Sequence, residues 1–198
     1  SSYSIFCWSL LILINIHFGN NYPICLELGC GKGEYTVALA KANPKINYIG
    51  IDIKGSRIYS GAEIVLKEKL QNVIFIRTQI EHVASLFNKN EVNEIWITFP
   101  DPQLKYNRRR KRLVHSSMLK KYQKILNNSG LVHLKTDSLF LHGYTLGVLE
   151  NGPYKILYST HDLYRNKPQE MSLNIKTYYE QIFLNDHQLI TYLSFSFL

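Results

Sequence analysis

Short apolar runs alternate with helical stretches along most of this chain. The apolar runs predict strands at Ile24–Leu28, Tyr48–Ile53, Val73–Arg77, Glu94–Phe99, Leu131–Lys135, Lys155–Ser159 and Leu189–Phe197. Helical patterns between them predict helices at Glu34–Ala42, Ser56–Leu70, Ile80–Phe87, Ser116–Leu126, Leu139–Glu150 and Ile175–Leu184. Strands separated by helices are expected to pair in parallel, because each helix returns the chain by a right-handed crossover.

The end of the chain departs from this alternation. Residues 188–197 are rich in strand-forming side chains, and no full helix separates them from a following strand. We therefore expect this segment to close the sheet as an antiparallel strand. The predicted fold is an α/β, doubly wound, Rossmann-like domain, with a mostly parallel seven-stranded sheet and an antiparallel last strand. In such a sheet, ligands bind at the carboxyl ends of the strands.

The length of 198 residues and the apolar content of 45% suit a single domain, which we assign to residues 21–198. Residues 1–20 form an N-terminal element of uncertain role. Its apolar run, Ile5–Ile16, spans about twelve residues, whereas a membrane helix needs about twenty. The run also lacks the basic start of a signal peptide, so we expect a packed element and no membrane association.

Cysteine and histidine spacing gives no framework for a metal site or for disulfides. Cys7, Cys25 and Cys30 are isolated thiols, and seven histidines are scattered along the chain. We therefore predict no metal site. The cysteine usage is typical of a reducing compartment, and we expect a cytoplasmic protein.

The positive charge is concentrated in one stretch. Nine lysines and arginines fall between Gln103 and Lys124 with no acid among them, and the other 14 of the 23 cations nearly balance 15 acids. Such a patch favours a phosphate backbone as its partner. An anionic membrane is the alternative, but no apolar helix face accompanies the patch. Lys120, Lys121 and Lys124 are interpreted as a solvated helix face.

A glycine-rich loop joins the first predicted strand to the first predicted helix. Its spacing, E-x-G-x-G-x-G, runs from Glu27 through Gly29 and Gly31 to Gly33. Glycine lets the backbone turn tightly and approach a ligand closely. A dinucleotide-binding loop would need glycine at position 34, where Glu34 stands. A carboxylate at that helix N-terminus would repel a pyrophosphate, which argues against a nicotinamide oxidoreductase.

Asp52 supplies the second half of a cofactor site. It ends the second predicted strand, 23 residues after Gly29. An acid at this position can accept hydrogen bonds from both hydroxyls of a ribose. The loop and the acid together indicate a nucleoside cofactor without phosphates. The alternative interpretation is a glycine-rich turn that binds nothing.

The fourth predicted strand ends in an acid held between two prolines. Asp101 lies between Pro100 and Pro102, and six cations then occupy the eight positions from Lys105 to Arg112. This order suggests that the chain holds a polyanion and presents one of its groups to a carboxylate. The alternative is a solvated basic loop after an ordinary Asp-Pro turn.

The loop and Asp52 resemble the cofactor site of the class I S-adenosylmethionine-dependent methyltransferases. The resemblance implies that Glu27 faces the methionine end of that cofactor, that the three loop glycines bring the backbone against it, and that Asp52 binds its ribose. It also implies a polar residue near the adenine after the third strand, where Gln79 stands.

The remaining motifs resemble those of the bacterial tRNA (guanine-N7-)-methyltransferase family. The FPDP turn, the basic run, the Thr-Asp end of the fifth strand and the T-x-[FY]-E pattern of Thr177–Glu180 occur in the family's order, from about Pro23 to the C-terminus. The resemblance implies that Asp101 is the catalytic acid and that it also contacts the cofactor. It implies substrate contacts at Lys105, Asn107, Arg108, Arg109, Arg110, Lys111, Arg112, Asp137, Thr177 and Glu180.

The chain departs from the family at one point and leaves three roles open. The family often has Trp-His after the FPDP turn, whereas this chain has Gln103 and Leu104 and so lacks the aromatic side chain there. Asp101 has an alternative as a plain turn residue, Asp137 as a cap of the following helix, and Glu180 as part of a solvated helix face.

The resemblance implies methyl transfer from S-adenosylmethionine to N7 of a guanine in the tRNA variable loop, guanine-46. N7 carries a free lone pair at neutral pH, so catalysis is expected to depend on positioning, with Asp101 or Asp137 stabilising the charge that reaches the purine ring. The alternatives are a class I methyltransferase acting on another RNA or nucleotide, and a non-catalytic RNA-binding module. The expected partner is tRNA, bound by a monomer or a homodimer.

Overall fold

The computed structural model describes residues 16–165 and 171–198. The apolar run predicted as a packed element, Ile5–Ile16, lies almost entirely outside these ranges. At the start of the described chain, Phe18 packs into the larger apolar core. The assignment of residues 21–198 to one domain stays a prediction.

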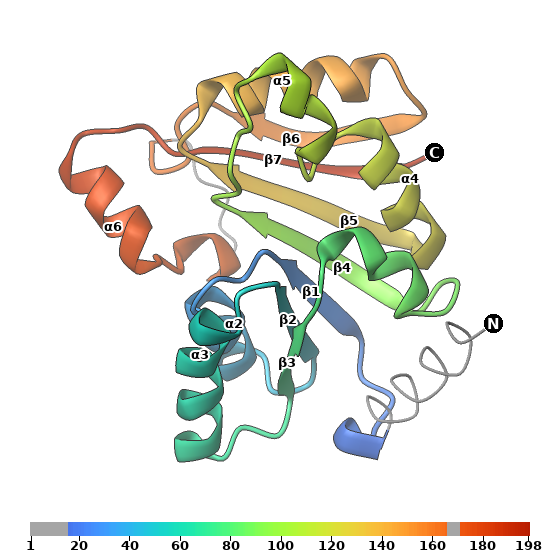
Figure 1. The fold of residues 1–198 in the computed structure, drawn as a ribbon, viewed down its shortest axis with the longest axis vertical. Coiled ribbons are helices and arrows are strands. Elements are labelled where there is room, and N and C mark those ends of the chain that lie inside the picture. Colours follow the sequence, from blue (N-terminus) through green and yellow to red (C-terminus); the bar gives the residue numbers. More distant parts are fainter. Residues whose placement is uncertain (1–15, 166–170) are drawn as a thin grey trace.

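One sheet of seven strands forms the centre of the fold (Figure 1). In chain order the strands are β1 (Ile24–Leu28), β2 (Asn47–Asp52), β3 (Val73–Arg77), β4 (Val92–Thr98), β5 (Leu126–Thr136), β6 (Tyr154–Thr160) and β7 (Thr191–Phe197). Across the sheet the order is β3-β2-β1-β4-β5-β7-β6. Strands β1 to β5 pair in parallel, whereas β7 is antiparallel to both β5 and β6. The predicted mostly parallel sheet with an antiparallel last strand is confirmed.

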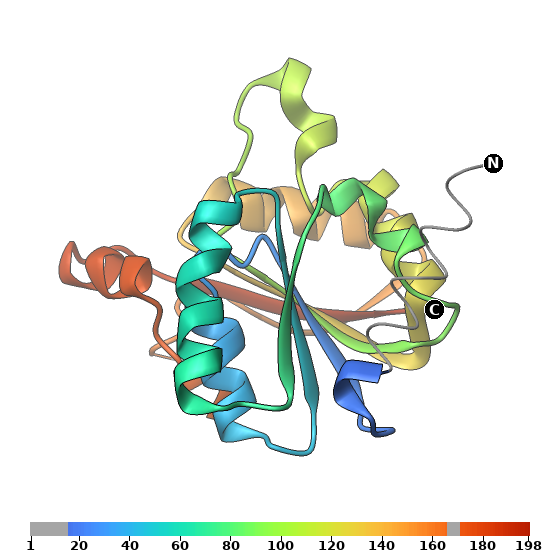
Figure 2. The ribbon, with the colours of Figure 1, turned by 60° about the horizontal axis from the view of Figure 1, so that its bottom comes forward.

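Helices cover both faces of the sheet. They are α2 (Glu34–Ala42), α3 (Gly55–Glu68), α4 (Ser116–Ile125), α5 (Leu139–Glu150) and α6 (Tyr178–Asn185), with the 3-10 helices η1 (Ile80–Ser85), η2 (Tyr106–Lys111) and η3 (Met171–Asn174). One apolar core joins a sheet face to η1, α4 and α5 through Val83, Leu119 and Leu141. A second core joins the opposite face to α2 and η3 through Leu39 and Leu173. Figure 2 shows α2 and α3 on one side of the sheet and η1 and α4 on the other.

Several predicted boundaries are corrected by the structure. The segment predicted as a helix at Ile80–Phe87 is the short 3-10 helix η1, in which only Val83 is buried and no side chain caps the start. Strand β5 begins at Leu126, directly after α4, because Leu126 pairs with Val92 across a register shift in β4. Helix α6 begins at Tyr178 rather than Ile175, since the residue before it is the N-terminal cap. The basic run forms η2, where no helix was expected.

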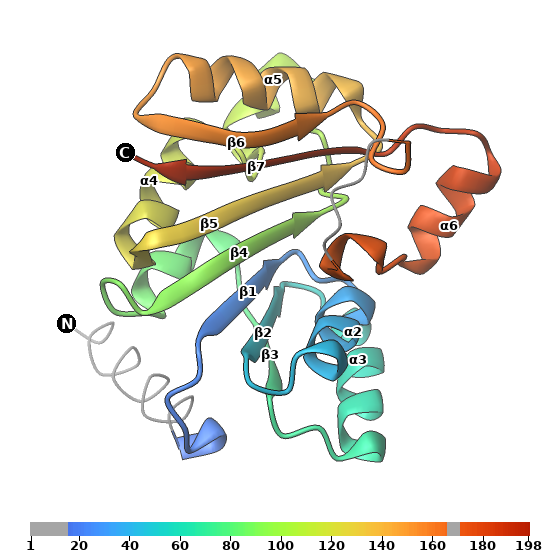
Figure 3. The same ribbon diagram turned by 180° about the vertical axis from the view of Figure 1, so that it is seen from behind.

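The strand order reverses between β1 and β4. Strands β2 and β3 extend the sheet from one side of β1, and β5 continues it from the far side of β4. Chain segments that leave the carboxyl ends of β1 and β4 therefore diverge, which leaves a crevice at that edge. Figure 3 shows the arrowheads of β1, β4 and β5 pointing toward the side on which α6 lies. The glycine loop and the FPDP turn both start at this edge.

Candidate active site

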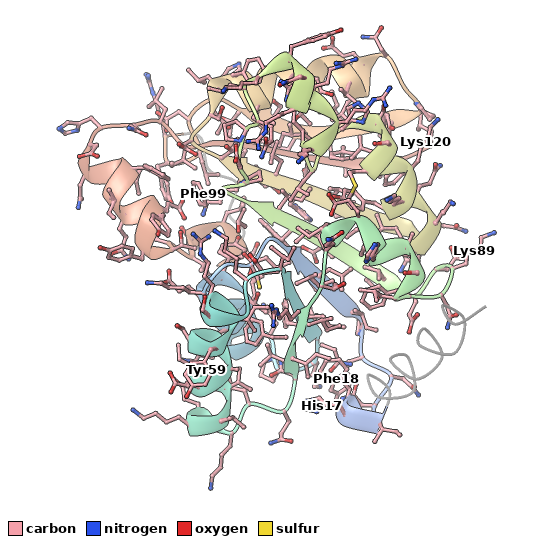
Figure 4. The ribbon with its side chains drawn as sticks, viewed as in Figure 1. His17, Phe18, Tyr59, Lys89, Phe99 and Lys120 are labelled. Carbon is pink, nitrogen blue, oxygen red and sulfur yellow. The ribbon has the colours of Figure 1, made fainter. Side chains whose placement is uncertain are left out.

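A cavity of about 450 Å³ opens at the carboxyl ends of β1, β4 and β5. Its lining comes from the glycine loop, the FPDP turn, the residue after β5 and the start of α6. Figure 4 shows Phe99, which lies on this lining, at the end of β4 on the side that faces α6. Six predicted site residues meet around the cavity, namely Glu27, Gly29, Gly31, Asp101, Asp137 and Thr177.

The three loop glycines have positive φ angles but different surroundings. Gly29, Gly31 and Gly33 have φ of 81°, 55° and 74°, values that favour glycine. At Gly31 nothing lies within 4 Å of the position that a Cβ would take, so the backbone is open on the cavity side. At Gly33 a Cβ would overlap the ring of Phe75. Gly31 therefore fits the predicted ligand contact, whereas Gly33 makes room for packing at the start of α2.

Asp52 lies beside the loop at the end of β2, with only 9% of its surface exposed. Its Oδ2 accepts the backbone N–H of Gly31 at 3.0 Å, and its Oδ1 accepts that of Lys54 at 2.8 Å. The loop is also fixed from β2 by the carbonyl of Ile51, which accepts the N–H of Gly29 at 2.7 Å. The acid thus holds the loop that it was predicted to complement.

Glu27 is buried below the loop and joins three elements. Its Oε2 accepts both the N–H and the hydroxyl of Thr36 in α2, and its Oε1 accepts the hydroxyl of Thr98 in β4 at 2.6 Å. Burial raises the pKa of Glu27 to about 7, although the hydrogen bonds from Thr36 and Thr98 oppose the shift. Its carboxyl group is therefore poised to change charge near neutral pH.

Two non-glycine residues with positive φ flank the centre of the FPDP turn, one at its first residue and one directly after it. Phe99 and Gln103 both have φ of 47°, a conformation that costs energy outside glycine. The N–H of Phe99 is held by the carbonyl of Lys135 at 2.8 Å. Between these residues Asp101 is exposed on the cavity, and its Oδ1 accepts the N–H of Gln103 at 2.9 Å. The turn and its strain hold a carboxylate at the cavity mouth.

Asp137 is half-buried on the same cavity. The helix that follows is capped by Ser138, whose hydroxyl accepts the N–H of Leu141 at 3.2 Å. The alternative interpretation of Asp137 as the cap is therefore wrong. Among the described residues its carboxylate has no hydrogen-bond partner, which leaves it available to a ligand.

Most of the predicted RNA-contacting residues lie on the surface outside the cavity. Lys105, Asn107, Arg108, Arg110 and Lys111 are exposed. Figure 2 shows η2, in yellow-green, projecting beyond the sheet. Arg109 is partly covered, and its guanidinium stacks on the Tyr106 ring at 4.0 Å from the centroid.

Arg112 is the exception in the basic run, and its predicted RNA contact is corrected. Only 5% of it is exposed. Its guanidinium donates to the carbonyls of Pro102 and Gln103 at 3.0–3.3 Å and stacks on the rings of Phe140 and Tyr144 in α5. Arg112 therefore ties the FPDP turn to α5.

Glu180 is the second corrected contact. It is fully buried and forms an ion pair with Lys135 at 2.8 Å, and it also accepts the hydroxyl of Tyr164. With Thr177 it forms a capping box at the start of α6. It is closed off from solvent and absent from the cavity lining, so neither the predicted substrate contact nor the alternative of a solvated face fits. Thr177 is the cap itself and lines the cavity, and its substrate contact stays a prediction.

Gln79 does not reach the cavity in this structure. It is exposed after β3, at the start of η1, and is absent from the cavity lining. The cavity is also lined by residues that were not predicted from the sequence, among them Arg57 and Phe183. No local motif marks Arg57 or Phe183. Tyr179 was available as the aromatic position of T-x-[FY]-E, and Thr98 as the last residue before the FPDP turn.

Neither a metal-ligand cluster nor a membrane-spanning helix occurs in the part of the chain that the structure describes. Within residues 16–165 and 171–198, no three His, Cys, Asp or Glu side chains are grouped closely enough to hold a metal ion. Within the same ranges, no helix combines the length and the apolar character needed to span a bilayer.

Two relatives of this chain carry the same name. The family model described as "Putative methyltransferase" matches residues 21–193. The tRNA (guanine-N(7)-)-methyltransferase of Christiangramia forsetii is 54% identical over 180 residues, which cover 90% of this chain and 80% of the relative. The protein of the same name from Porphyromonas gingivalis is 49% identical over 179 residues, which cover 90% of this chain and 72% of the relative.

Solved structures share the fold at low sequence identity. An antibiotic-related methyltransferase superposes with a TM-score of 0.69 at 18% identity, over 95% of this chain and 94% of that one. A SAM-dependent methyltransferase from Aquifex aeolicus gives a TM-score of 0.62 at 12% identity, over 95% and 89%. The fold is thus that of the class I S-adenosylmethionine-dependent methyltransferases. With the identities above, the chain belongs to the tRNA (guanine-N(7)-)-methyltransferase family.

Proposed function

We propose that this chain transfers a methyl group from S-adenosylmethionine to N7 of a guanine in tRNA. One observation carries the proposal: the open backbone of the glycine loop and two carboxylates, Asp101 and Asp137, line the same cavity in a member of this family. The names of the relatives supply the acceptor, and the cavity supplies a site at which cofactor and base can meet.

The residues around the loop fit a positively charged nucleoside cofactor. The open side of Gly31 leaves room for the ligand, and within the described chain neither Glu27 nor Asp52 forms an ion pair, so both favour a cation nearby. S-adenosylmethionine, when bound, supplies a methyl group on a positively charged sulfur. We assign its methionine end to the side of Glu27 and its ribose to Asp52. The adenine contact of Gln79 stays a prediction.

The chain's contribution to the acceptor step is positioning and charge. Guanine N7 needs no base, because its lone pair is free at neutral pH. A carboxylate can accept the N1–H and amino hydrogens of guanine and can stabilise the positive charge that the ring gains. We propose that Asp101 takes the catalytic role and that Asp137 and Thr177 bind the base.

The tRNA backbone is held by the exposed cations that follow the FPDP turn. Lys105, Arg108, Arg110 and Lys111 are exposed, and the chain enters this stretch directly from Pro102 on the cavity. Phosphates bound here would bring RNA to the cavity mouth. The acceptor base must leave its stack to enter, and phosphate binding can offset that cost.

The finer assignments belong to the same proposal. We propose guanine-46 of the variable loop as the acceptor, action in the cytoplasm, and a monomer or homodimer as the active form. The acceptor position rests on the family resemblance and the compartment on the cysteine usage, rather than on the geometry of the cavity.

Incubation of bulk unmodified tRNA with labelled S-adenosylmethionine, followed by nucleoside analysis, tests the proposal. The expected product is N7-methylguanosine, and chain cleavage at the modified base locates its position. A different methylated nucleoside would favour another acceptor. Cofactor binding without transfer to any RNA would favour a non-catalytic RNA-binding module.

A further inference from the structure

Lys135 is fully buried at the carboxyl end of β5. A lysine side chain is almost never fully buried unless its charge is paired. Its Nζ donates to the carbonyl of Ile175 at 2.9 Å and forms the ion pair with Glu180 at 2.8 Å. The rings of Tyr35 and Tyr164 flank the ammonium at 5.4 and 5.9 Å. The side chain thus spans from the sheet to the segment that leads into α6.

Glu180, a residue of α6, is the ion-pair partner of this ammonium group. Its Oε1 accepts Lys135 and the Tyr164 hydroxyl, and its Oε2 accepts the backbone N–H of Thr177 at 3.4 Å. The hydroxyl of Thr177 accepts the N–H of Glu180 in return. One carboxylate therefore fixes both the start of α6 and its distance from β5.

The backbone of Lys135 reaches the other walls of the cavity. Its carbonyl accepts the N–H of Phe99 at 2.8 Å, where the FPDP turn begins. Two residues further along the chain is Asp137, which lines the cavity. Lys135 is thus bonded to the segments that carry Asp101, Asp137 and Thr177.

We propose that Lys135 is a positioning residue. Its ion pair with Glu180 holds α6 against the cavity in a fixed position relative to the carboxylates of Asp101 and Asp137. The residues positioned in this way are Thr177, Tyr179 and Phe183, all on the lining. The expected loss of methylation activity rests on the proposed function, whereas the expected placement of α6 does not.

The energetics separate a positional role from a stabilising one. Two apolar side chains of similar volume would fill this space without the cost of burying two charges, so a buried ion pair is poor support for stability alone. Removing one partner leaves an uncompensated buried charge. Removing both leaves apolar packing, which does not fix the orientation of α6 as an ion pair does. A variant with both charges removed therefore tests position without an unpaired charge in the core.

Amide hydrogen exchange and steady-state kinetics are measured on Lys135→Met and on the double variant Lys135→Met/Glu180→Met. We expect the amides of Tyr178–Asn185 to exchange on the order of tenfold faster in both variants, and those of α5 to be unchanged. The double variant is expected to recover part of the urea midpoint that Lys135→Met loses, because the buried charge is gone while the hydrogen bonds of Glu180 to Tyr164 and Thr177 stay absent. Its kcat/KM for tRNA is expected to stay on the order of 10–100-fold low, while its affinity for S-adenosylhomocysteine stays close to that of the wild type.

Lys41→Met is the matched control. It breaks a surface ion pair between Lys41 and Glu68 of similar length, 2.7 Å, and is expected to change none of these measurements. Recovery of both the midpoint and kcat/KM in the double variant would mean that the pair serves stability only, against the proposal. Wild-type exchange of the α6 amides in both variants would also overturn it. Failure of the wild type to methylate tRNA would remove the proposed function, while the exchange data would still decide the role of the pair.

Discussion

The Oδ2 atom of Asp52 accepts the backbone N–H of Gly31 at 3.0 Å. The acid at the end of β2 and the middle of the glycine loop therefore form one unit, although the sequence suggested two separate contacts with a cofactor. Each carboxylate oxygen has a second lone pair, so the same acid can hold the loop and still accept a hydroxyl.

Asp52→Ala is expected to weaken S-adenosylmethionine binding by about 1–3 kcal/mol, because the ribose hydrogen bonds and the support of the loop are lost together. Asp52→Asn is expected to fall between the alanine variant and the wild type, since the amide oxygen keeps one acceptor. Isothermal titration calorimetry measures both. Unchanged affinity in the alanine variant would contradict the cofactor assignment.

Gly33→Ala is expected to destabilise the fold more than Gly31→Ala. The positive φ of each residue makes alanine cost about 1–2 kcal/mol at either position. At Gly33 the Phe75 ring occupies the place of the new Cβ, which adds about 1–3 kcal/mol of overpacking. Urea unfolding gives the two values. Adding Phe75→Leu to Gly33→Ala should recover part of the loss; no recovery would mean that the ring is not its source.

Glu27 is expected to make the stability of the cofactor-free protein depend on pH. Its folded pKa of about 7 lies above the unfolded value of 4.5, mainly because of burial. The folded state therefore binds more protons between these values, and stability falls as pH rises from 4.5 to 7. The free energy of unfolding of the wild type minus that of Glu27→Gln should drop by about 2–4 kcal/mol over this range. A difference that stays flat in urea titrations from pH 4.5 to 8 would show that the carboxyl is not shifted.

Replacing the exposed cations Arg108, Arg110 and Lys111 together by alanine is expected to lower the slope of log affinity for tRNA against log salt by about 2–3. Cofactor affinity should be unchanged. The matched control is Arg112→Met. It should leave the salt slope intact but slow methylation, because the carbonyls of Pro102 and Gln103 lose their buried donor. An unchanged slope in the triple variant would assign the patch to another partner.

The sequence predicted the sheet and the position of the cavity because both depend on local patterns. Parallel strands bring all their carboxyl ends to one edge, so the motifs after β1, β4 and β5 could be expected to meet there. The left-handed glycines and the prolines of the FPDP turn are also local signals, and they mark where the backbone leaves the sheet.

The roles of Glu180 and Arg112 could not be predicted from local sequence patterns. A charged residue becomes buried when its partners close around it, and those partners lie far away in the chain. Lys135 lies in β5 and pairs with Glu180 of α6, while Phe140 and Tyr144 of α5 cover Arg112. The same holds for Gln79, whose position after β3 was predicted but whose distance from the cavity depends on the path of η1.

The turnover of Asp101→Asn tests the central claim most directly, namely that this cavity methylates guanine N7 with the help of the Asp101 charge. Asparagine keeps the size of the side chain and an oxygen for the N–H of Gln103, but it removes the negative charge. With saturating tRNA and cofactor, kcat should fall on the order of 100-fold, with both affinities close to wild type and N7-methylguanosine still the product. Turnover near that of the wild type would leave Asp101 as a turn residue, and a methyl group on any other atom would contradict the proposed function itself.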